Sequence, residues 1–379
     1  MLPKIGVIGG SGVYQIDGLQ SQNWVTIQTP WGSPSDDILT GTLNGTEMAF
    51  LPRHGRGHVH SPSSVPYRAN IDALKRLGCT DIIAVSAVGS LRADYQPGDF
   101  VLVDQYIDRT FARDKSFFGL GCVAHVSLAH PTCARLGEAV TRAAAPRRAS
   151  PATANVATET TPATTPGTTP TATSAATPAP PTTAAATPPT TAASTPAATP
   201  ASAATPTTTP ASTPASTPTT ASATTPAATP AATPAFTPAI TLHQGATYLA
   251  IEGPQFSTLA ESRLYRQWGA DVIGMTGMPE AKLAREAEMC YASLAMVTDY
   301  DCWHPDHGAV DVAQVIATLT ANAAQARSLI ANLSFTRPDP CPCGCDRALT
   351  YALMTAPPKR DPDLVAKLDA VAGRVLKGQ

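Results

Sequence analysis

The sequence predicts an α/β fold in which a mixed central sheet is flanked by helices. Short apolar runs alternate with segments of helical periodicity, a pattern typical of a sheet covered on both faces. Glycine-rich or polar turns follow several of these runs, and two carboxylates, Asp299 and Asp301, close the last one, residues 291–297. Because ligands of such folds bind at the carboxyl ends of the strands, these turns are the first place to look for a site.

The elements expected before residue 146 are strands and helices in alternation. Strands are predicted at 4–8, 48–52, 81–85 and 100–103, and helices at 67–77 and 132–144. The first helix has Ile71, Leu74 and Leu77 at helical spacing and ends before Gly78, as helices often do.

After residue 238 the alternation resumes. Strands are predicted at 246–251, 271–273 and 291–297, and helices at 259–268, 310–333 and 363–376. A further helix is expected to begin with Pro279 in its first turn, where a missing backbone N–H is harmless.

A low-complexity block separates these two halves. Residues 146–238 are almost entirely Ala, Thr, Pro and Ser and hold 20 of the 37 prolines. No helix or sheet ladder tolerates that proline density, and methyl groups of Ala and Thr cannot offset the entropy of ordering. We therefore expect a disordered, partly polyproline-II insertion that emerges at the surface as a tolerated loop expansion.

Composition excludes several classes of protein. A net charge of −2 gives no reason to expect nucleic acid or an anionic membrane as partner, and no run of eighteen apolar residues predicts a membrane span. The first residues resemble a strand entering a glycine turn rather than an export signal, so a cytoplasmic location is expected.

The eight cysteines divide into scattered single residues and a cluster. The single ones suggest thiols in a reducing compartment that act as small hydrophobes. Cys341, Cys343 and Cys345 could be structural, redox-active or metal-binding. Because their spacing is not CxxC and no second cysteine or histidine pair completes them in the sequence, no metal site is predicted.

Donors suited to an anion follow several predicted strands. The turn 9–12 offers backbone N–H groups and a hydroxyl, without the Lys-Ser/Thr of a P-loop. A guanidinium and an imidazole follow the second strand, and two hydroxyls follow later ones. These candidate phosphate ligands are Ser11, Arg53, His54, Ser86 and Thr276.

The two acids suit a nitrogen-rich, amino-substituted heterocycle. One carboxylate can accept from the amino group, while the other, if protonated, can donate to a ring nitrogen. Alternatively, Asp299 and Asp301 are solvated acids of an ordinary strand-end turn.

Six motifs in order carry a specific resemblance. They are Ile8-Gly-Gly-Ser-Gly12, Pro52-Arg-His-Gly-Arg56, Ser86-Ala-Val-Gly-Ser-Leu91, Glu252-Gly-Pro-Gln-Phe256, Gly274-Met-Thr-Gly-Met-Pro-Glu280 and Thr298-Asp-Tyr-Asp301. Together they resemble the S-methyl-5′-thioadenosine phosphorylases of the trimeric purine nucleoside phosphorylase family. The resemblance covers residues 3–145 and 239–333, and we expect residues 1–145 and 239–333 to form one catalytic domain. Residues 334–379, a cysteine-containing segment with a terminal helix, lie outside it.

The resemblance implies roles for individual residues. Asp299 is expected to address purine N7 and Asp301 the 6-amino group, with His54 as a further catalytic residue. His125 is expected to reach the methylthio end of the substrate across a homotrimer interface. The remaining nucleoside-binding residues implied are Phe256, Ser257, Met275, Val312, Val315 and Ile316, beside the five phosphate ligands named above.

The reaction implied is phosphorolysis in purine and methionine salvage, without metal or organic cofactor. Methylthioadenosine and inorganic phosphate, a co-substrate, give adenine and 5-methylthioribose-1-phosphate. Breaking the C1′–N9 bond puts negative charge on the base, which a protonated Asp299 would relieve, and positive charge on the sugar, which phosphate would stabilise and capture. Burial and the neighbouring Asp301 favour such a protonated acid. His54 either transfers a proton or only orients phosphate.

Three alternatives remain open at this point. A 6-oxopurine nucleoside phosphorylase would favour Asn, which can donate to O6, where this chain has Asp299. A nucleosidase would use water and needs no guanidinium such as Arg53. An inactive scaffold that binds partners through its Pro/Thr tract would leave the site residues idle, and that tract lacks the basic and aromatic residues of polyproline ligands.

Two positions depart from the family pattern, because Ser11 and Ser86 stand where threonine is common.

Overall fold

A mixed sheet forms the centre of the fold. The computed structural model describes residues 3–10, 12–13, 15–145, 240–306 and 312–377. In this part of the chain nine strands hydrogen-bond in the order β2-β3-β4-β1-β5-β8-β7-β6-β9. Their bounds are Lys4–Gly9 (β1), Gln20–Val25 (β2), Ile38–Leu43 (β3), Thr46–Pro52 (β4), Asp81–Ser90 (β5), Phe100–Asp108 (β6), Leu242–Ala250 (β7), Val272–Gly274 (β8) and Cys290–Asp299 (β9).

The sheet closes on itself along one half. Strand β5 pairs with β8 and also, in parallel, with β9, so β5, β8, β7, β6 and β9 form a ring. Strands β1 to β4 continue from β5 as an open extension. The α/β class and the mixed sheet are confirmed. The closure was not predicted, because strand pairing across the ring joins residues far apart in the sequence.

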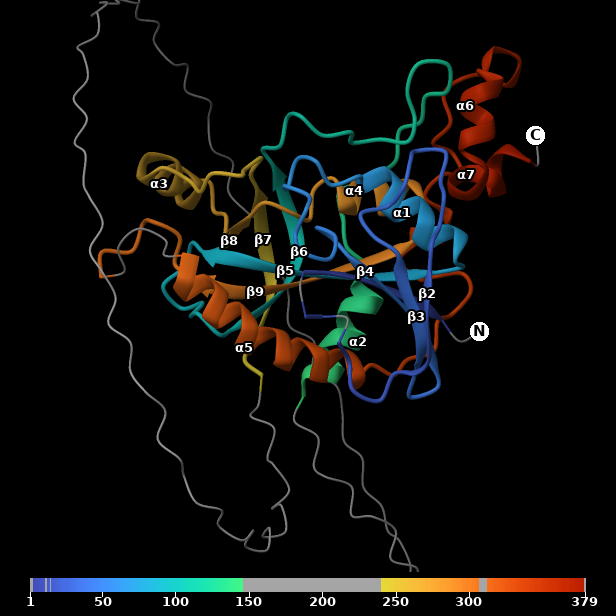
Figure 1. Cartoon of the computed structure of the whole chain (residues 1–379). Helices are drawn as coiled ribbons and strands as arrows, with labels where there is room; N and C mark the ends of the chain where they lie inside the picture. Colours follow the sequence, from blue (N-terminus) through green and yellow to red (C-terminus); the bar gives the residue numbers. More distant parts are fainter. Residues whose placement is uncertain (1–2, 11, 14, 146–239, 307–311, 378–379) are drawn as a thin grey trace, which may run out of the picture. The chain divides into compact units, whose positions relative to one another are not determined.

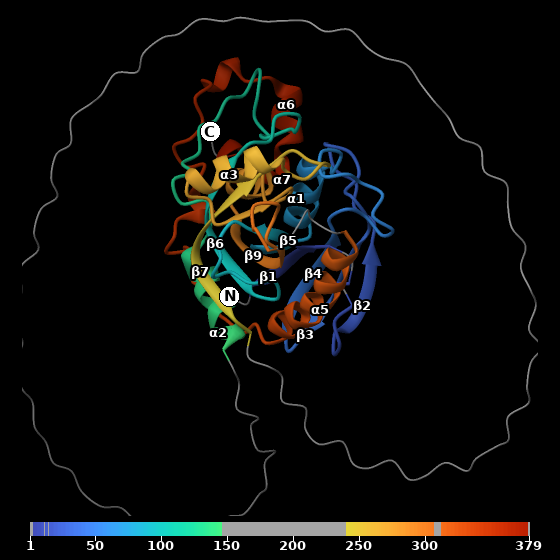
Figure 2. The same cartoon turned by 90° about the vertical axis from the view of Figure 1, so that its left-hand side faces the viewer.

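Helices cover the sheet on two sides (Figure 1). Helices α1 (Tyr67–Arg76), α4 (Glu280–Glu286) and α7 (Asp369–Leu376) pack on one core cluster, with α6 (Pro362–Lys367) beside α7. Helices α2 (Ala134–Ala144) and α5 (Val312–Ala331) pack on a second cluster. Figure 2, turned by 90°, again shows α2 and α5 on the side opposite α1. Helix α3 (Leu259–Gln267) contributes Tyr265 to a third, smaller cluster.

Strand β9 has an almost entirely apolar sequence because both of its faces are buried. Tyr291, Ala295 and Val297 belong to one core cluster, whereas the intervening Leu294 and Met296 belong to the other. Successive side chains of a strand point to opposite faces, so a strand buried on both faces shows no polar alternation. The acids at its end are therefore delivered by a rigid, fully buried element.

Several predicted boundaries need correction. Strand β5 extends through Ser90, so Ser86 lies inside a strand rather than in a turn after it. Strands β2 and β3 were missed; β2 is almost fully exposed and lacks a buried face that its pattern could reveal. Pro279 is the N-cap of α4 rather than a first-turn residue, and the terminal helix is divided at Leu368 into α6 and α7.

The Ala/Thr/Pro-rich segment 146–238 lies outside the described residues, so its disorder and the division into domains stay predictions. The C-terminal segment does contribute to the main core, through Leu349, Ala352 and Val371. Among the described helices, none has both the length and the apolar character needed to cross a membrane.

Candidate active site

A cavity of about 300 Å³ lies at the ends of the central strands. It receives residues from the loops after β1, β4, β7 and β8, from β5 and β9 themselves, and from α5. The predicted site residues that line it are Arg53, His54, Ser86, Phe256, Ser257, Met275, Thr276, Asp299, Asp301 and Val315. Segments separated by more than two hundred residues in the chain thus converge on one space.

Arg53 lines this cavity, and its side chain is only 2 % exposed. Its Nε and Nη2 donate to the Glu280 carboxylate at 2.5 and 3.2 Å. Nη1 donates to the carbonyl of Val85 at 2.8 Å, and Nη2 to that of Ile8 at 3.3 Å. A guanidinium has five N–H donors, so within the described part of the chain these four bonds leave one N–H on Nη1 for a ligand. The ion pair with Glu280 also neutralises much of the charge that an anion would meet.

Two hydroxyls, those of Ser86 and Thr276, also line the cavity. The buried Ser86 Oγ has no hydrogen-bond partner among the described residues, although a buried polar atom normally has one. Thr276 is also buried, and its Oγ1 lies 3.5 Å from the Tyr248 hydroxyl. Ser86 is therefore available to donate to a bound anion.

His54 is a neutral acceptor rather than a donor toward the cavity. Its Nδ1 lies 2.9 Å from the carbonyl of His60, which can only accept, so Nδ1 carries the proton. Burial, together with the nearby Arg53 charge, lowers the pKa of His54 to about 4. Nε2 is then an unprotonated acceptor at neutral pH. The ring stacks on His58 at 4.3 Å between centroids, which fixes its plane.

Asp299 and Asp301 lie together where β9 ends. Asp299 is oriented by two donors, the Thr298 hydroxyl at 2.7 Å and the Asp301 backbone N–H at 2.8 Å. Gly89 makes room for this turn, because a Cβ there would lie 2.9 Å from Asp299 Oδ1. Burial, with a smaller contribution from the Asp299 charge, raises the pKa of Asp301 to about 6.

Large apolar side chains also line the cavity. Phe256 and Met275 line it with Ser257, whose Oγ has no hydrogen-bond partner within the described ranges. Gly253 adopts a φ of 67°, and a Cβ at this position would approach the Met275 sulfur to 2.5 Å. The loop after β7 can therefore lie against Met275 only with glycine at this position.

Glu252 anchors that loop and does not line the cavity. Its carboxylate accepts hydrogen bonds from Ser63 and from the backbone N–H groups of Phe111 and Ala112, and it forms an ion pair with Arg113 at 3.2 Å. Although burial acts to raise it, these bonds lower the pKa of Glu252 to about 2.

Three predicted site residues do not line this cavity, and a fourth is not described by the structure. Ser11 lies outside the described residues. His125 is exposed and lies beside the C-terminal segment, where its backbone N–H donates to the carbonyl of Ala352 at 2.9 Å. Val312 and Ile316 are 56 % and 57 % exposed on α5. The roles of all four stay predictions.

Sequence reasoning missed several members of the site. Glu280, the partner of Arg53, is 1 % exposed, and an acidic residue in an apolar segment after Pro279 was the available signal. His58 lines the cavity with a φ of 57°, and nothing in its local sequence indicates this. Leu319 and Ala323 on α5 also line the cavity.

Among the described residues, only one group of ligand-type side chains is close enough to hold a metal. It consists of Cys133, Cys290, Cys341 and Cys345, at the other end of β9 from the cavity. The cavity itself offers N–H and O–H donors for an anion and carboxyl groups for a polar heterocycle.

Comparison with known proteins agrees with this geometry. The model of the phosphorylase superfamily matches residues 4–174 and 189–334. A relative from Cereibacter sphaeroides named S-methyl-5′-thioadenosine phosphorylase is 54 % identical over 381 residues, which covers 100 % of both chains. A relative of the same name from Rhodospirillum rubrum is 47 % identical and covers 99 % of this chain and 97 % of its own.

Solved structures are similar over most of the chain as well. A methylthioadenosine phosphorylase from an antarctic soil metagenomic library has a TM-score of 0.68 and 36 % identity, covering 98 % of this chain and 99 % of that one. Methylthioadenosine phosphorylase from Schistosoma mansoni in complex with adenine has a TM-score of 0.60 and 29 % identity, covering 87 % of this chain and 90 % of that one.

Proposed function

This chain belongs to the phosphorylase superfamily, and we propose that it is an S-methyl-5′-thioadenosine phosphorylase of salvage metabolism. It transfers the methylthioribosyl group from adenine to inorganic phosphate, as a pentosyltransferase. The observation that carries the proposal is that one cavity is lined by a buried hydroxyl without a partner among the described residues, by a guanidinium and by the Asp299–Asp301 pair. The relatives' full-length similarity supports the same reaction.

Phosphate is bound by Arg53, Ser86, Thr276 and Ser11, with His54 beside it. Since Arg53 has one N–H left and shares its charge with Glu280, the hydroxyls carry much of the binding. His54 accepts a hydrogen bond from a protonated phosphate oxygen through Nε2, because its Nδ1–H is held by His60. In this arrangement His54 orients phosphate for attack on C1′ and transfers no proton to the base.

The base is recognised by the two carboxyl groups. Asp301, ionised above its pKa of about 6, accepts from the 6-amino group, and a protonated Asp299 gives its proton to N7 as the C1′–N9 bond breaks. Bound phosphate stabilises the positive charge on the sugar and then captures C1′. Phe256, Ser257 and Met275 line the base and ribose positions.

A neighbouring subunit completes the site in a homotrimer. Val312 and Ile316 are exposed apolar residues on the same helix as the cavity-lining Val315, and His125 is exposed elsewhere on the chain. Such residues suit a 5′-methylthio pocket that is shared between protomers. Mass measurement in solution should give three chains. His125→Ala should raise KM for methylthioadenosine more than KM for phosphate.

The protein works in the cytoplasm in this proposal. Its eight cysteines are all free, in keeping with a reducing compartment.

Product analysis tests the proposed reaction. Purified protein is incubated with methylthioadenosine or inosine, each with and without phosphate, and the bases are separated by chromatography. Adenine released only with phosphate is the expected result. Hypoxanthine from inosine with methylthioadenosine untouched would instead identify a 6-oxopurine enzyme. Adenine release without phosphate would identify a nucleosidase.

A further inference from the structure

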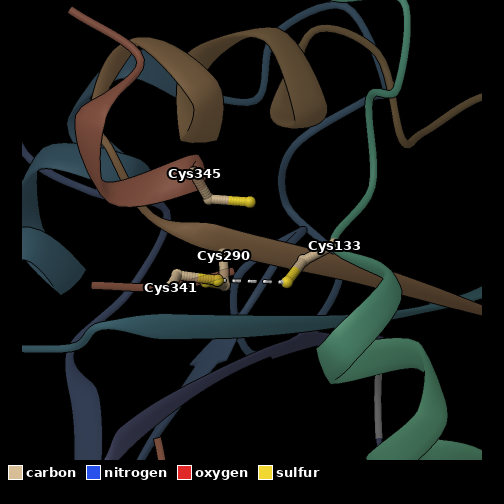
Figure 3. A group of neighbouring side chains, drawn as sticks. All are labelled: Cys133, Cys290, Cys341 and Cys345. Atoms are coloured by element: carbon tan, nitrogen blue, oxygen red, sulfur yellow. Dashed lines mark hydrogen bonds between the residues drawn. The ribbon is translucent and has the colours of Figure 1, made fainter. Parts of the chain in front are cut away.

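Four cysteines from three parts of the chain meet in the interior. Cys133 is the N-cap of α2, Cys290 is the first residue of β9, and Cys341 and Cys345 come from the C-terminal segment. Figure 3 shows their side chains pointing towards one another, and all four sulfurs lie within 4.8 Å of each other. Each residue is at most 3 % exposed. We name these residues the cysteine cluster.

The sulfur spacing fits a tetrahedral metal better than disulfides. Cys133 Sγ lies 3.8 Å from Cys341 Sγ, which in turn lies 3.5 Å from Cys290 Sγ. A disulfide requires about 2.05 Å between sulfurs. Four thiolates at about 2.3 Å from a central Zn²⁺ stand roughly 3.8 Å apart, because that is the edge of the tetrahedron. We propose that the cysteine cluster binds one structural Zn²⁺ ion.

Two arginines next to the cluster suit the charge of such a site. Four thiolates around Zn²⁺ carry a net charge of −2. Arg135 and Arg337 both pair with Asp81, the strand neighbour of Cys290, and Arg337 also pairs with Asp346 at 3.0 Å. Arg135 Nε and Nη1 are buried and have no hydrogen-bond partner among the described residues, so they are free to donate to thiolate sulfur.

Tertiary packing brings two further cysteines to the 341–345 motif, which has no second pair nearby in the sequence. Cys133 and Cys290 complete it from more than fifty residues away. Cys343, in the middle of the motif, is exposed and outside the cluster. In this proposal Cys133 and Cys290 are metal ligands as well as members of the hydrophobic core.

The role of the metal is structural. Cys290 and Asp299 are the two ends of β9, and ten strand residues span about 30 Å, so the ion is remote from the cavity. It joins the C-terminal segment to the start of β9 and to α2. Binding displaces four thiol protons to solvent, and no residue changes oxidation state.

Metal analysis of the full-length protein, purified without chelating resin, tests this inference independently of the proposed reaction. We expect inductively coupled plasma mass spectrometry to find about one zinc ion per chain. Cys133→Ser and Cys345→Ser should each lose most of it. Cys343→Ser, the matched control from the same motif, should retain it.

Two measurements on the wild-type chain keep the test decisive if the variants do not fold. Protein denatured with a chelator should expose eight free thiols. Protein isolated without zinc should take up one ion on titration and release about four protons. Four or six free thiols would contradict the proposal by indicating disulfides in the cluster. Failure to take up zinc, or stoichiometric iron in its place, would also contradict it.

Discussion

The two ends of strand β9 perform opposite tasks. Its last residue, Asp299, lies at a cavity where Ser86 and Ser257 keep buried hydroxyls without partners in the described part of the chain. Its first residue, Cys290, lies in the fully buried cysteine cluster. Substrates are proposed to bind and dissociate at the cavity end, whereas the proposed Zn²⁺ ion stays bound at the cluster end. One rigid strand can support both because its middle is buried on both faces.

The largest expected loss of catalytic activity comes from a substitution at the cavity end of β9. Asp299→Ala removes the group proposed to protonate N7, and loss of a general acid costs roughly 10²–10⁴-fold in rate. We expect kcat/KM for methylthioadenosine to fall by that factor while zinc content stays unchanged. Steady-state kinetics and metal analysis on the same preparation check both ends. A variant with near-wild-type kcat/KM would contradict the role of Asp299.

The phosphate side should show a smaller effect. Ser86→Ala removes a hydroxyl proposed to donate to an anion, a bond worth about 1.5–3 kcal/mol, or roughly 10–100-fold in affinity. We expect KM for phosphate to rise accordingly, with KM for the nucleoside little changed. Ser86→Thr keeps the hydroxyl and serves as the matched control. An equal rise in both KM values would indicate general disruption instead.

The pH dependence of the free enzyme should show Asp301. The residue must be ionised to accept from the 6-amino group, and its pKa is raised to about 6. kcat/KM for methylthioadenosine should therefore fall about tenfold per pH unit below that value. His54, with a pKa lowered to about 4, should add no step near pH 6.5. A pH profile of Asp301→Asn should lack the acidic limb.

Asp301 should also cost stability at neutral pH. Its folded-state pKa lies above the ordinary value of 3.8, so the folded protein binds the proton more tightly than the unfolded chain. The stabilisation is fully present below pH 4 and is lost as pH rises through about 6. At pH 7 the neutral Asp301→Asn should raise the free energy of unfolding, by on the order of 2 kcal/mol. Denaturant unfolding at pH 4 and pH 7 measures this, and an equal effect at both would contradict it.

The smallest effect on catalysis is expected from the cluster end. Cys345→Ser should lower the melting temperature, yet leave kcat/KM within about twofold wherever the chain stays folded, since remote sites are nearly additive. Cys343→Ser should change neither quantity. A large loss of kcat/KM in folded Cys345→Ser would show that the two ends of β9 are coupled.

Sequence reasoning went furthest where chemistry is local. The acids Asp299 and Asp301 follow a recognisable buried strand, and most candidate phosphate and purine residues do line one cavity. It fell short where partners come from distant segments. Three features depend on tertiary packing that no local spacing encodes. They are the Arg53–Glu280 ion pair, the pairing of β5 with β9 that closes the ring, and the contact of Cys133 with Cys341.

Phosphorus NMR on a reaction mixture of protein, methylthioadenosine and inorganic phosphate tests the central proposal most directly. We predict that the phosphate resonance declines as a sugar phosphomonoester appears, one for each adenine released, and that Ser86→Ala slows both equally. Adenine release with the phosphate resonance unchanged would contradict the account, because the bond would then be cleaved by water.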